Sequence, residues 1–254
     1  AAVHALGDIW AMGAQPQAAT ASLILPRMSS ELQERTVAEI MSAATAVIED
    51  AGARINGGHT SQGDALTIGF TVTGLTKKPI TLAGAKPGDA LILTKPIGSG
   101  TIMAAEMAGR AQGADVSACL EAMMQDQAAA SKILAKAHAM TDVTGFGLAG
   151  HLRGMCDASG VGAALDLQQI PMMQGAAALS AAGVRSSLFA ANQAGAGPIA
   201  GPACDLLYDP QTAGGLLAAV PQKTAQALLK DLIAADYPAA VIGNITEGSE
   251  IIIH

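Results

Sequence analysis

The charged side chains best suited to chemistry lie in segments rich in glycine and other small residues. Asp8 is the only charge in the apolar stretch ALGDIWAMGA, and Asp142 stands at a predicted strand end before the Gly-rich turn TDVTGFG. A buried carboxylate is costly unless a cation or hydrogen bonds satisfy it, and Mg²⁺ prefers carboxylate oxygens. Both residues are therefore candidate metal ligands. The alternatives are a solvent-facing Asp8 and a helix cap formed by Thr144.

Two further segments combine glycine with polar residues. Gly57, Gly58, His59 and Thr60 directly follow a predicted strand. The glycines let backbone N–H groups approach an anion and Thr60 adds a hydroxyl, so this segment is a phosphate site or an ordinary turn. The segment DPQTAGGL (209–216) leads into another predicted strand and also fits plain turn chemistry.

One glycine pair is misleading. Gly98-Ser99-Gly100 lies between a predicted strand and a predicted helix, as a dinucleotide-binding fingerprint would. Met103 stands in place of the third glycine, and Lys95 does not complete a P-loop. The sequence therefore predicts neither of these nucleotide-binding motifs.

Composition narrows the classes of function. The 254 residues carry a formal charge of −7, and the 14 basic residues form no cluster, which argues against nucleic acid as a partner. The cysteines, Cys119, Cys156 and Cys204, are far apart, which indicates small core residues in a reducing cytoplasm rather than disulfides or a zinc site. No apolar run approaches the ~20 residues of a membrane span.

Helices and strands alternate along the chain, which predicts an α/β or α+β class. The expected helices are 1–12, 30–51, 101–111, 116–139, 148 onward and 224–235. The expected strands are 21–25, 54–56, 66–72, 90–94, 141–144, 163–167, 216–220, 240–245 and 250–253. Ser30 and Gln33 are expected to form a capping box, and residues 193–202 a mobile loop.

The Gly/Pro-rich stretch 83–89 (AGAKPGD) is the predicted domain boundary, which divides the chain into residues 1–85 and 86–254. Residues 1–12 have the pattern of a helix whose first turn would lie before residue 1. No capping residue precedes them and there is no initiator methionine, so we expect the natural protein to begin further upstream.

Taken in order, ALGDIWAMGA, GGHT, LTKPIGSGT, TDVTGFGLAGHL and DPQTAGGLL resemble the successive motifs of selenophosphate synthetase (selenide, water dikinase). This family lies within the superfamily of aminoimidazole ribonucleotide synthetase. The resemblance covers essentially the whole chain, and the last two segments are the most specific. It implies two α/β domains and a homodimer in which amino-domain strands form a shared β-barrel.

The resemblance also implies a reaction, the conversion of selenide, ATP and water into selenophosphate, AMP and phosphate. Mg²⁺ ions would neutralise the phosphates as charge moves. By motif, Asp8 and Asp142 match metal-binding carboxylates, and residues 57–60 would line the phosphate side.

Several family features have no counterpart here. They are the Gly-rich amino-terminal loop with a reactive Cys or selenocysteine, its Lys, and a further metal-binding Asp. No cysteine matches the nucleophile, so no catalytic residue is assigned, and these 254 residues alone are expected to bind nucleotide weakly and make no measurable selenophosphate. Gly7 and Ala213 stand where serine is common.

The segment GGHTSQGD is closest to the branch that is fused behind a pyridine nucleotide-disulfide oxidoreductase. Two other functions stay open. One is another kinase or ligase of the superfamily, and the other is a non-catalytic nucleotide-binding or dimerisation module.

Overall fold

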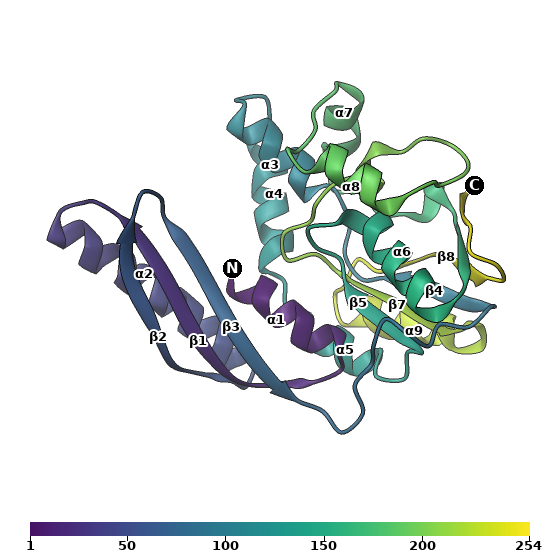
Figure 1. Ribbon diagram of the computed structural model, residues 1–254, viewed down its shortest axis with the longest axis horizontal. Coiled ribbons are helices and arrows are strands. Elements are labelled where there is room, and N and C mark those ends of the chain that lie inside the picture. Colours follow the sequence, from purple (N-terminus) through teal and green to yellow (C-terminus); the bar gives the residue numbers. More distant parts are fainter.

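The computed structural model describes residues 1–254, which form two β-sheets with helices packed around them (Figure 1). The helices are α1 (Ala2–Ala11), α2 (Ser30–Asp50), α3 (Ser99–Met107), α4 (Gly113–Met124), α5 (Ala128–Ile133), α6 (Gly147–Ser159), α7 (Ala176–Ala181), α8 (Phe189–Ala196) and α9 (Gln222–Ala234), with short 3₁₀ helices η1 (Leu167–Gln169) and η2 (Asp205–Tyr208). The strands are β1 (Gln15–Pro26), β2 (Arg54–Gly63), β3 (Thr67–Leu75), β4 (Asp89–Leu93), β5 (Ala139–Asp142), β6 (Gly162–Leu165), β7 (Leu216–Pro221), β8 (Ala240–Thr246) and β9 (Ile251–Ile253). The predicted mixed α/β class is confirmed. No helix is both long enough and apolar enough to cross a membrane.

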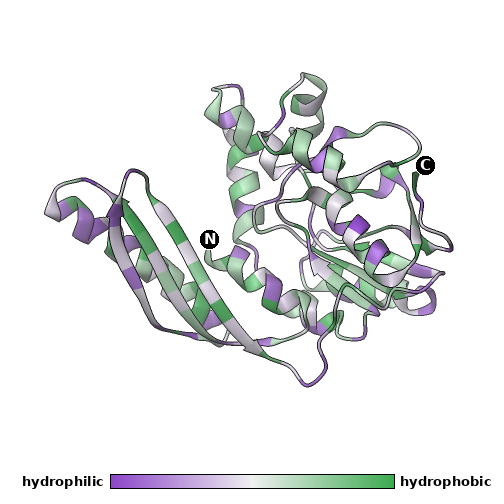
Figure 2. Ribbon diagram, in the orientation of Figure 1, coloured by the Kyte–Doolittle hydropathy of each residue, from purple (hydrophilic) through white to green (hydrophobic).

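The first sheet has three strands in the order β2-β1-β3, with β1 parallel to β2 and antiparallel to β3. Residues of β1 alternate between buried and exposed from Ala19 to Leu25, as expected for a strand with one covered face. Helices α1 and α2 cover that face through a cluster that includes Leu6, Trp10 and Ile48. Figure 2 shows the same alternation as green and paler segments along β1 and β3.

The second sheet has six strands in the order β5-β7-β4-β8-β6-β9, antiparallel except for the β6–β9 pair. Every residue of β4 is buried. Leu91 and Leu93 join a cluster with residues of α6, whereas Ala90 and Ile92 join a cluster with residues of α5 and α9. Successive residues of a strand point to opposite faces, so both faces of this sheet are covered and its central strands read as continuous apolar runs.

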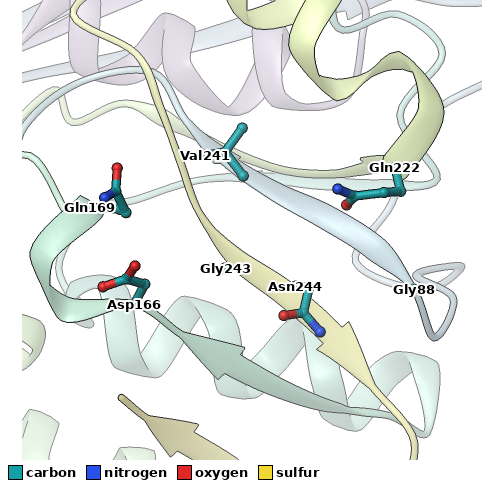
Figure 3. Close-up of a pocket in the computed structure, with 7 residues that line it drawn as sticks. All are labelled: Gly88, Asp166, Gln169, Gln222, Val241, Gly243 and Asn244. Atoms are coloured by element: carbon teal, nitrogen blue, oxygen red, sulfur yellow. The ribbon is translucent and has the colours of Figure 1, made fainter.

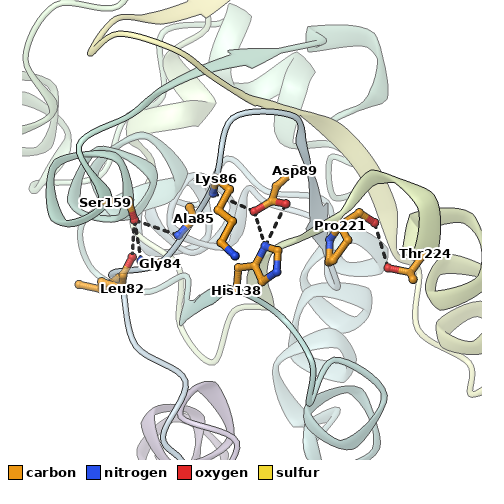
Figure 4. Close-up of polar contacts among 9 residues, drawn as sticks. All are labelled: Leu82, Gly84, Ala85, Lys86, Asp89, His138, Ser159, Pro221 and Thr224. Carbon is orange, nitrogen blue, oxygen red and sulfur yellow. Dashed lines mark hydrogen bonds and ion pairs between the residues drawn. The ribbon is translucent and has the colours of Figure 1, made fainter.

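Polar contacts fix the segment that connects the two sheets (Figure 4). Ser159 Oγ accepts hydrogen bonds from the backbone N–H groups of Gly84 and Ala85, both at 3.1 Å. The carboxylate of Asp89, at the start of β4, contacts Nδ1 of His138 at 2.8 Å. The connection is therefore attached to α6 at one point and to the segment before β5 at another.

Tertiary packing moves several predicted boundaries. Strand β1 begins at Gln15 rather than Ala21, because its polar first half pairs with β2 and β3 on either side. The single helix predicted over 116–139 is two helices, with Gln125 in an extended conformation between them. The N-cap of α2 is Ser29, whose Oγ accepts from the Leu32 N–H at 3.4 Å, so the capping-box prediction is wrong by one residue.

Two short helices were not predicted. Helix α7 lies in a stretch for which no element was expected, and α8 extends to Ala196, into the predicted loop 193–202. Helix α7 is only six residues long and alanine-rich, and α8 is alanine-rich and weakly amphipathic, so their periodicity gives little signal.

Candidate active site

The carboxylate of Asp142 lies at the end of β5 against helix α1. Asp142 is 7% exposed, and a β-carbon added to Gly7 of α1 would lie 2.8 Å from its Oδ2. Asp8, the next residue of α1, is exposed. Burial raises the pKa of Asp142 to about 6, and the negative charge of Asp8 adds to this rise. The structure therefore brings the two predicted carboxylates together.

This carboxylate pair has no compensating positive side chain. None of the chain's salt bridges involves Asp8 or Asp142, and no third His, Cys, Asp or Glu joins them to form a cluster. A buried carboxylate whose proton affinity is raised by a neighbouring negative charge is a suitable place for a cation. Mg²⁺ commonly binds one or two carboxylates and takes its other ligands from water and phosphate, so this donor set fits it.

The turn Asp209–Gly215 packs against the amino terminus of α3. Oε1 of Gln211 accepts hydrogen bonds from the backbone N–H groups of Gly98 (2.9 Å) and Ser99 (3.1 Å). Nε2 of Gln211 donates to Oδ2 of Asp209 (3.0 Å), which also accepts from Thr101 Oγ1 through its other oxygen (2.8 Å). Gln211 thus occupies the amino-terminal end of α3, where a dinucleotide-binding fingerprint would hold a phosphate. This is why the Gly98-Ser99-Gly100 pattern is misleading.

The same turn contacts two other motif segments. The backbone N–H of Gln211 donates to the Thr144 carbonyl (3.0 Å), and the Val143 N–H donates to the Gly215 carbonyl (2.8 Å). The backbone N–H of Ala213 donates to Nδ1 of His4 on α1 (3.0 Å). The turn therefore joins LTKPIGSG, TDVTGFG and the Asp8 helix, three segments that are far apart in sequence.

The Gly-rich turn after Asp142 is fixed by a buried neutral histidine. The Thr144 N–H donates to Nε2 of His151 at 2.9 Å. Burial lowers the pKa of His151 to about 4, so the ring stays neutral and keeps this acceptor. The side chain of Asn192 donates to the Gly145 carbonyl at 2.8 Å. Thr144 makes no side-chain cap for α6, so the capping alternative is wrong.

The GGHT segment lies elsewhere. Gly57, Gly58, His59 and Thr60 are inside β2, not in a turn after a strand, and all four are exposed. A β-carbon on Gly58 would lie 2.0 Å from the Ala21 carbonyl oxygen, so the close pairing with β1 requires glycine. The β2-β1-β3 order puts β1 between this segment and β3, the strand against which α1 packs. The structure therefore does not bring residues 57–60 to the carboxylate pair within one chain.

Two family models match this chain, each over a different part of the sequence. The family model "AIR synthase related protein, N-terminal domain" matches residues 1–76, and "AIR synthase related protein, C-terminal domain" matches residues 86–254. "Selenide, water dikinase" of Myxococcus xanthus is 40% identical over 261 residues, covering 98% of this chain and 73% of that protein. The enzyme of that name from Bdellovibrio bacteriovorus is 35% identical, covering 96% and 73%. The chain belongs to the selenide, water dikinase family.

Solved structures share the fold of this dikinase-family chain. Thiamine-monophosphate kinase from Stenotrophomonas maltophilia superposes with a TM-score of 0.75 at 22% identity, covering 98% of this chain and 75% of that one. The hydrogenase maturation protein HypE in complex with ATP superposes with a TM-score of 0.68 at 21% identity, covering 97% and 71%. The predicted synthetase-like fold is confirmed.

All three cysteines of this dikinase-family chain have weakened acidity. Burial raises the pKa of Cys119 and Cys156 to about 11, and it also raises the pKa of half-buried Cys204. A thiol must ionise to act as a nucleophile. Their surroundings therefore do not favour a thiolate.

Sequence reasoning missed three residues around the dikinase-family motifs: His4, Lys95 and Asn192. Lys95 carried a signal, because it is a lone charge between a buried strand and a proline. His4 and Asn192 carried none, since each contacts a segment distant in sequence.

A separate cavity of about 480 Å³ lies beside β8 of the six-stranded sheet (Figure 3). Its lining residues are Gly88, Asp166, Gln169, Gln222, Val241, Gly243 and Asn244. None of them belongs to the dikinase-family motifs, so this cavity is not part of the candidate active site.

Proposed function

We propose that this chain binds Mg·ATP at the Asp8–Asp142 pair and serves the ATP-dependent synthesis of selenophosphate from selenide and water, with AMP and phosphate as the other products. The observation that carries the proposal is the uncompensated carboxylate pair between α1 and β5, in a chain of the selenide, water dikinase family. The raised pKa of Asp142 indicates a site that favours an added positive charge.

Magnesium would supply charge neutralisation for the polyphosphate during phosphoryl transfer. The chain's own contribution is to hold two carboxylates at fixed positions. Asp142 is fixed by burial at the strand end, and Asp8 by the packing of α1. Fixed charges need no rearrangement as the reaction proceeds, which is the basis of electrostatic catalysis.

We further propose that residues 57–60 contact phosphate. In support, these residues are exposed on an edge strand, where backbone N–H groups are free of a second neighbouring strand. Thr60 offers a hydroxyl, and Gly57 has open space around its α-carbon.

Titration calorimetry with ATP in Mg²⁺ tests the metal assignment. Asp142→Asn preserves shape and removes one charge, and it should weaken Mg·ATP binding about tenfold or more, or about 1.4 kcal/mol per tenfold. Asp166→Asn, an exposed aspartate in the separate cavity, is the matched control and should bind as the wild type does. Unchanged Mg·ATP affinity in Asp142→Asn would sink the assignment.

We also propose that the chain, with domains 1–85 and 86–254, forms a homodimer through its three-stranded sheet. In support, α1 and α2 cover only one face of this sheet, and β1 exposes Thr20, Ser22 and Ile24 on the other. Ile24→Glu should shift the mass in sedimentation experiments toward the monomer. Leu32→Glu, at an exposed position of α2, should leave the mass unchanged. A wild-type monomer at micromolar concentration contradicts the proposal.

A further inference from the structure

Lys95 is a buried cation that the proposed chemistry does not use. It follows β4, is 1% exposed and forms no salt bridge. Its Nζ donates to the carbonyl oxygens of Ala122 (2.8 Å), Gln125 (2.5 Å) and Ala213 (2.9 Å). An ammonium group has three donors, so all of them are used. Such complete pairing is what makes a buried ammonium tolerable.

Two of these acceptors belong to the end of α4. Ala122 lies in the last turn of the helix and Gln125 is its C-cap. The final carbonyls of a helix lack intrahelical partners and carry partial negative charge, so they favour a cation. Lys95 therefore donates hydrogen bonds to carbonyl groups at the end of α4, at the break between α4 and α5.

The third acceptor, Ala213, has an unusual backbone. Its φ is +49°, in the left-handed region that alanine rarely adopts. Its carbonyl accepts from Lys95 and its N–H donates to Nδ1 of His4 at 3.0 Å. The turn also packs closely on the backbone of residue 95, because a β-carbon on Gly215 would lie 2.5 Å from the backbone nitrogen of Lys95.

His4 lies one turn before Asp8 on α1, and residues four apart share a helix face. A contact that fixes His4 therefore also fixes the turn that carries Asp8. Gly7 of the same turn lies against Asp142.

We propose that Lys95 is a positioning residue for the Asp8–Asp142 site. It holds the carbonyl of Ala213, so that the N–H of the same residue can hold His4 and keep α1 in place opposite Asp142. This inference rests on the proposed function for its effect on Mg·ATP, but not for its effect on the turn.

A double-mutant cycle between Lys95 and His4 tests the connection, because the two residues meet through Ala213. Lys95→Met keeps the length of the side chain and removes the ammonium, and His4→Ala removes the acceptor. Each should weaken Mg·ATP binding about tenfold, and the double variant should bind about as the single variants do, because both break the same connection. Losses that multiply to about a hundredfold overturn the proposal.

Hydrogen exchange supplies a readout that needs no nucleotide. In Lys95→Met the Ala213 amide should exchange at least about tenfold faster relative to the Leu216 amide, which is bonded to Thr94 Oγ1. Wild-type exchange at Ala213 overturns the proposal. If the wild-type protein binds no Mg·ATP, the proposed function fails, while this readout still decides the role of Lys95.

Leu232→Ala is the control for general destabilisation, because Leu232 is fully buried in α9 and belongs to a different cluster. At a temperature where it is folded, it should bind Mg·ATP as the wild type does. If Leu232→Ala lost as much Mg·ATP affinity as Lys95→Met does, general destabilisation would explain the effect of Lys95→Met, and the proposal would be overturned. If Lys95→Met does not fold, His4→Ala still tests the proposal, because His4 is only half-buried. Wild-type Mg·ATP affinity in His4→Ala would also contradict the proposal.

Discussion

The α-carbon of Gly7 lies so close to the Asp142 carboxylate that a β-carbon there would be 2.8 Å from Oδ2. Because residue 7 has no side chain, helix α1 contacts the end of β5 without displacing this carboxylate. This approach also brings the charge of Asp8 within range of Asp142. The carboxylate pair therefore results from packing between α1, which covers the three-stranded sheet, and the end of β5 in the six-stranded sheet.

Gly7→Ser should fold with nearly wild-type stability, because the atom it meets is the end of a side chain that can rotate. Its hydroxyl can donate to the carboxylate, which favours the ionised form and should lower the pKa of Asp142. Carbon-13 NMR titration measures this pKa. Gly113→Ser, where the β-position is open, should leave it unchanged. A pKa that stays the same or rises in Gly7→Ser would contradict the contact.

Asp142→Asn should stabilise the metal-free protein near neutral pH. Burial and Asp8 raise the pKa of Asp142 from 3.8 to about 6, so the protonated form is favoured in the folded state. The resulting stabilisation is complete below about pH 4 and is lost as the pH rises through about 6. At about pH 7.5 the ionised carboxylate of Asp142 lowers the free energy of unfolding of the wild type by up to about 3 kcal/mol. The neutral asparagine should not have this cost. Urea denaturation across this range checks the trend, and a variant no more stable than the wild type at the upper end disproves it.

His151→Gln should weaken the acid sensitivity of the fold. Burial lowers the pKa of His151 from 6.5 to about 4, so its neutral form contributes stability that is full above about pH 6.5 and lost as the pH falls through about 4. The glutamine carbonyl oxygen can accept from the Thr144 N–H without titrating. Thermal denaturation between these values should show a shallower acid slope than the wild type. His254→Gln, at an exposed position, should retain the wild-type slope, and the same slope in both variants would count against this role.

Gln211→Met should cost about 2–4 kcal/mol of stability, because the buried N–H groups of Gly98 and Ser99 lose their acceptor. The midpoint of urea denaturation measures the loss. Gln168→Met, at an exposed position of η1, should change stability by less than about 0.5 kcal/mol. Equal effects of the two substitutions would show that Gln211 does not cap α3.

Much of the fold could be predicted from the sequence where the local pattern is strong. The apolar run of β4 and the helix of α9 were predicted within two residues of their observed bounds. Prediction failed where contacts from elsewhere decide the conformation. Lys95 donates hydrogen bonds to carbonyl groups at the break between α4 and α5. Residues Gln15–Thr20 belong to β1 because they pair with neighbouring strands.

The sequence by itself determined which chemical groups the motif segments carry, and the order of these segments along the chain predicted the family, with Asp8 and Asp142 as candidate metal ligands. Only the tertiary structure decided that Asp142 is buried against Gly7, that His4 and Lys95 hold Ala213 from its two sides, and that residues 57–60 lie in an edge strand. The reason is physical. A residue's type is local, whereas its burial, pKa and hydrogen-bond partners depend on which distant segments pack against it.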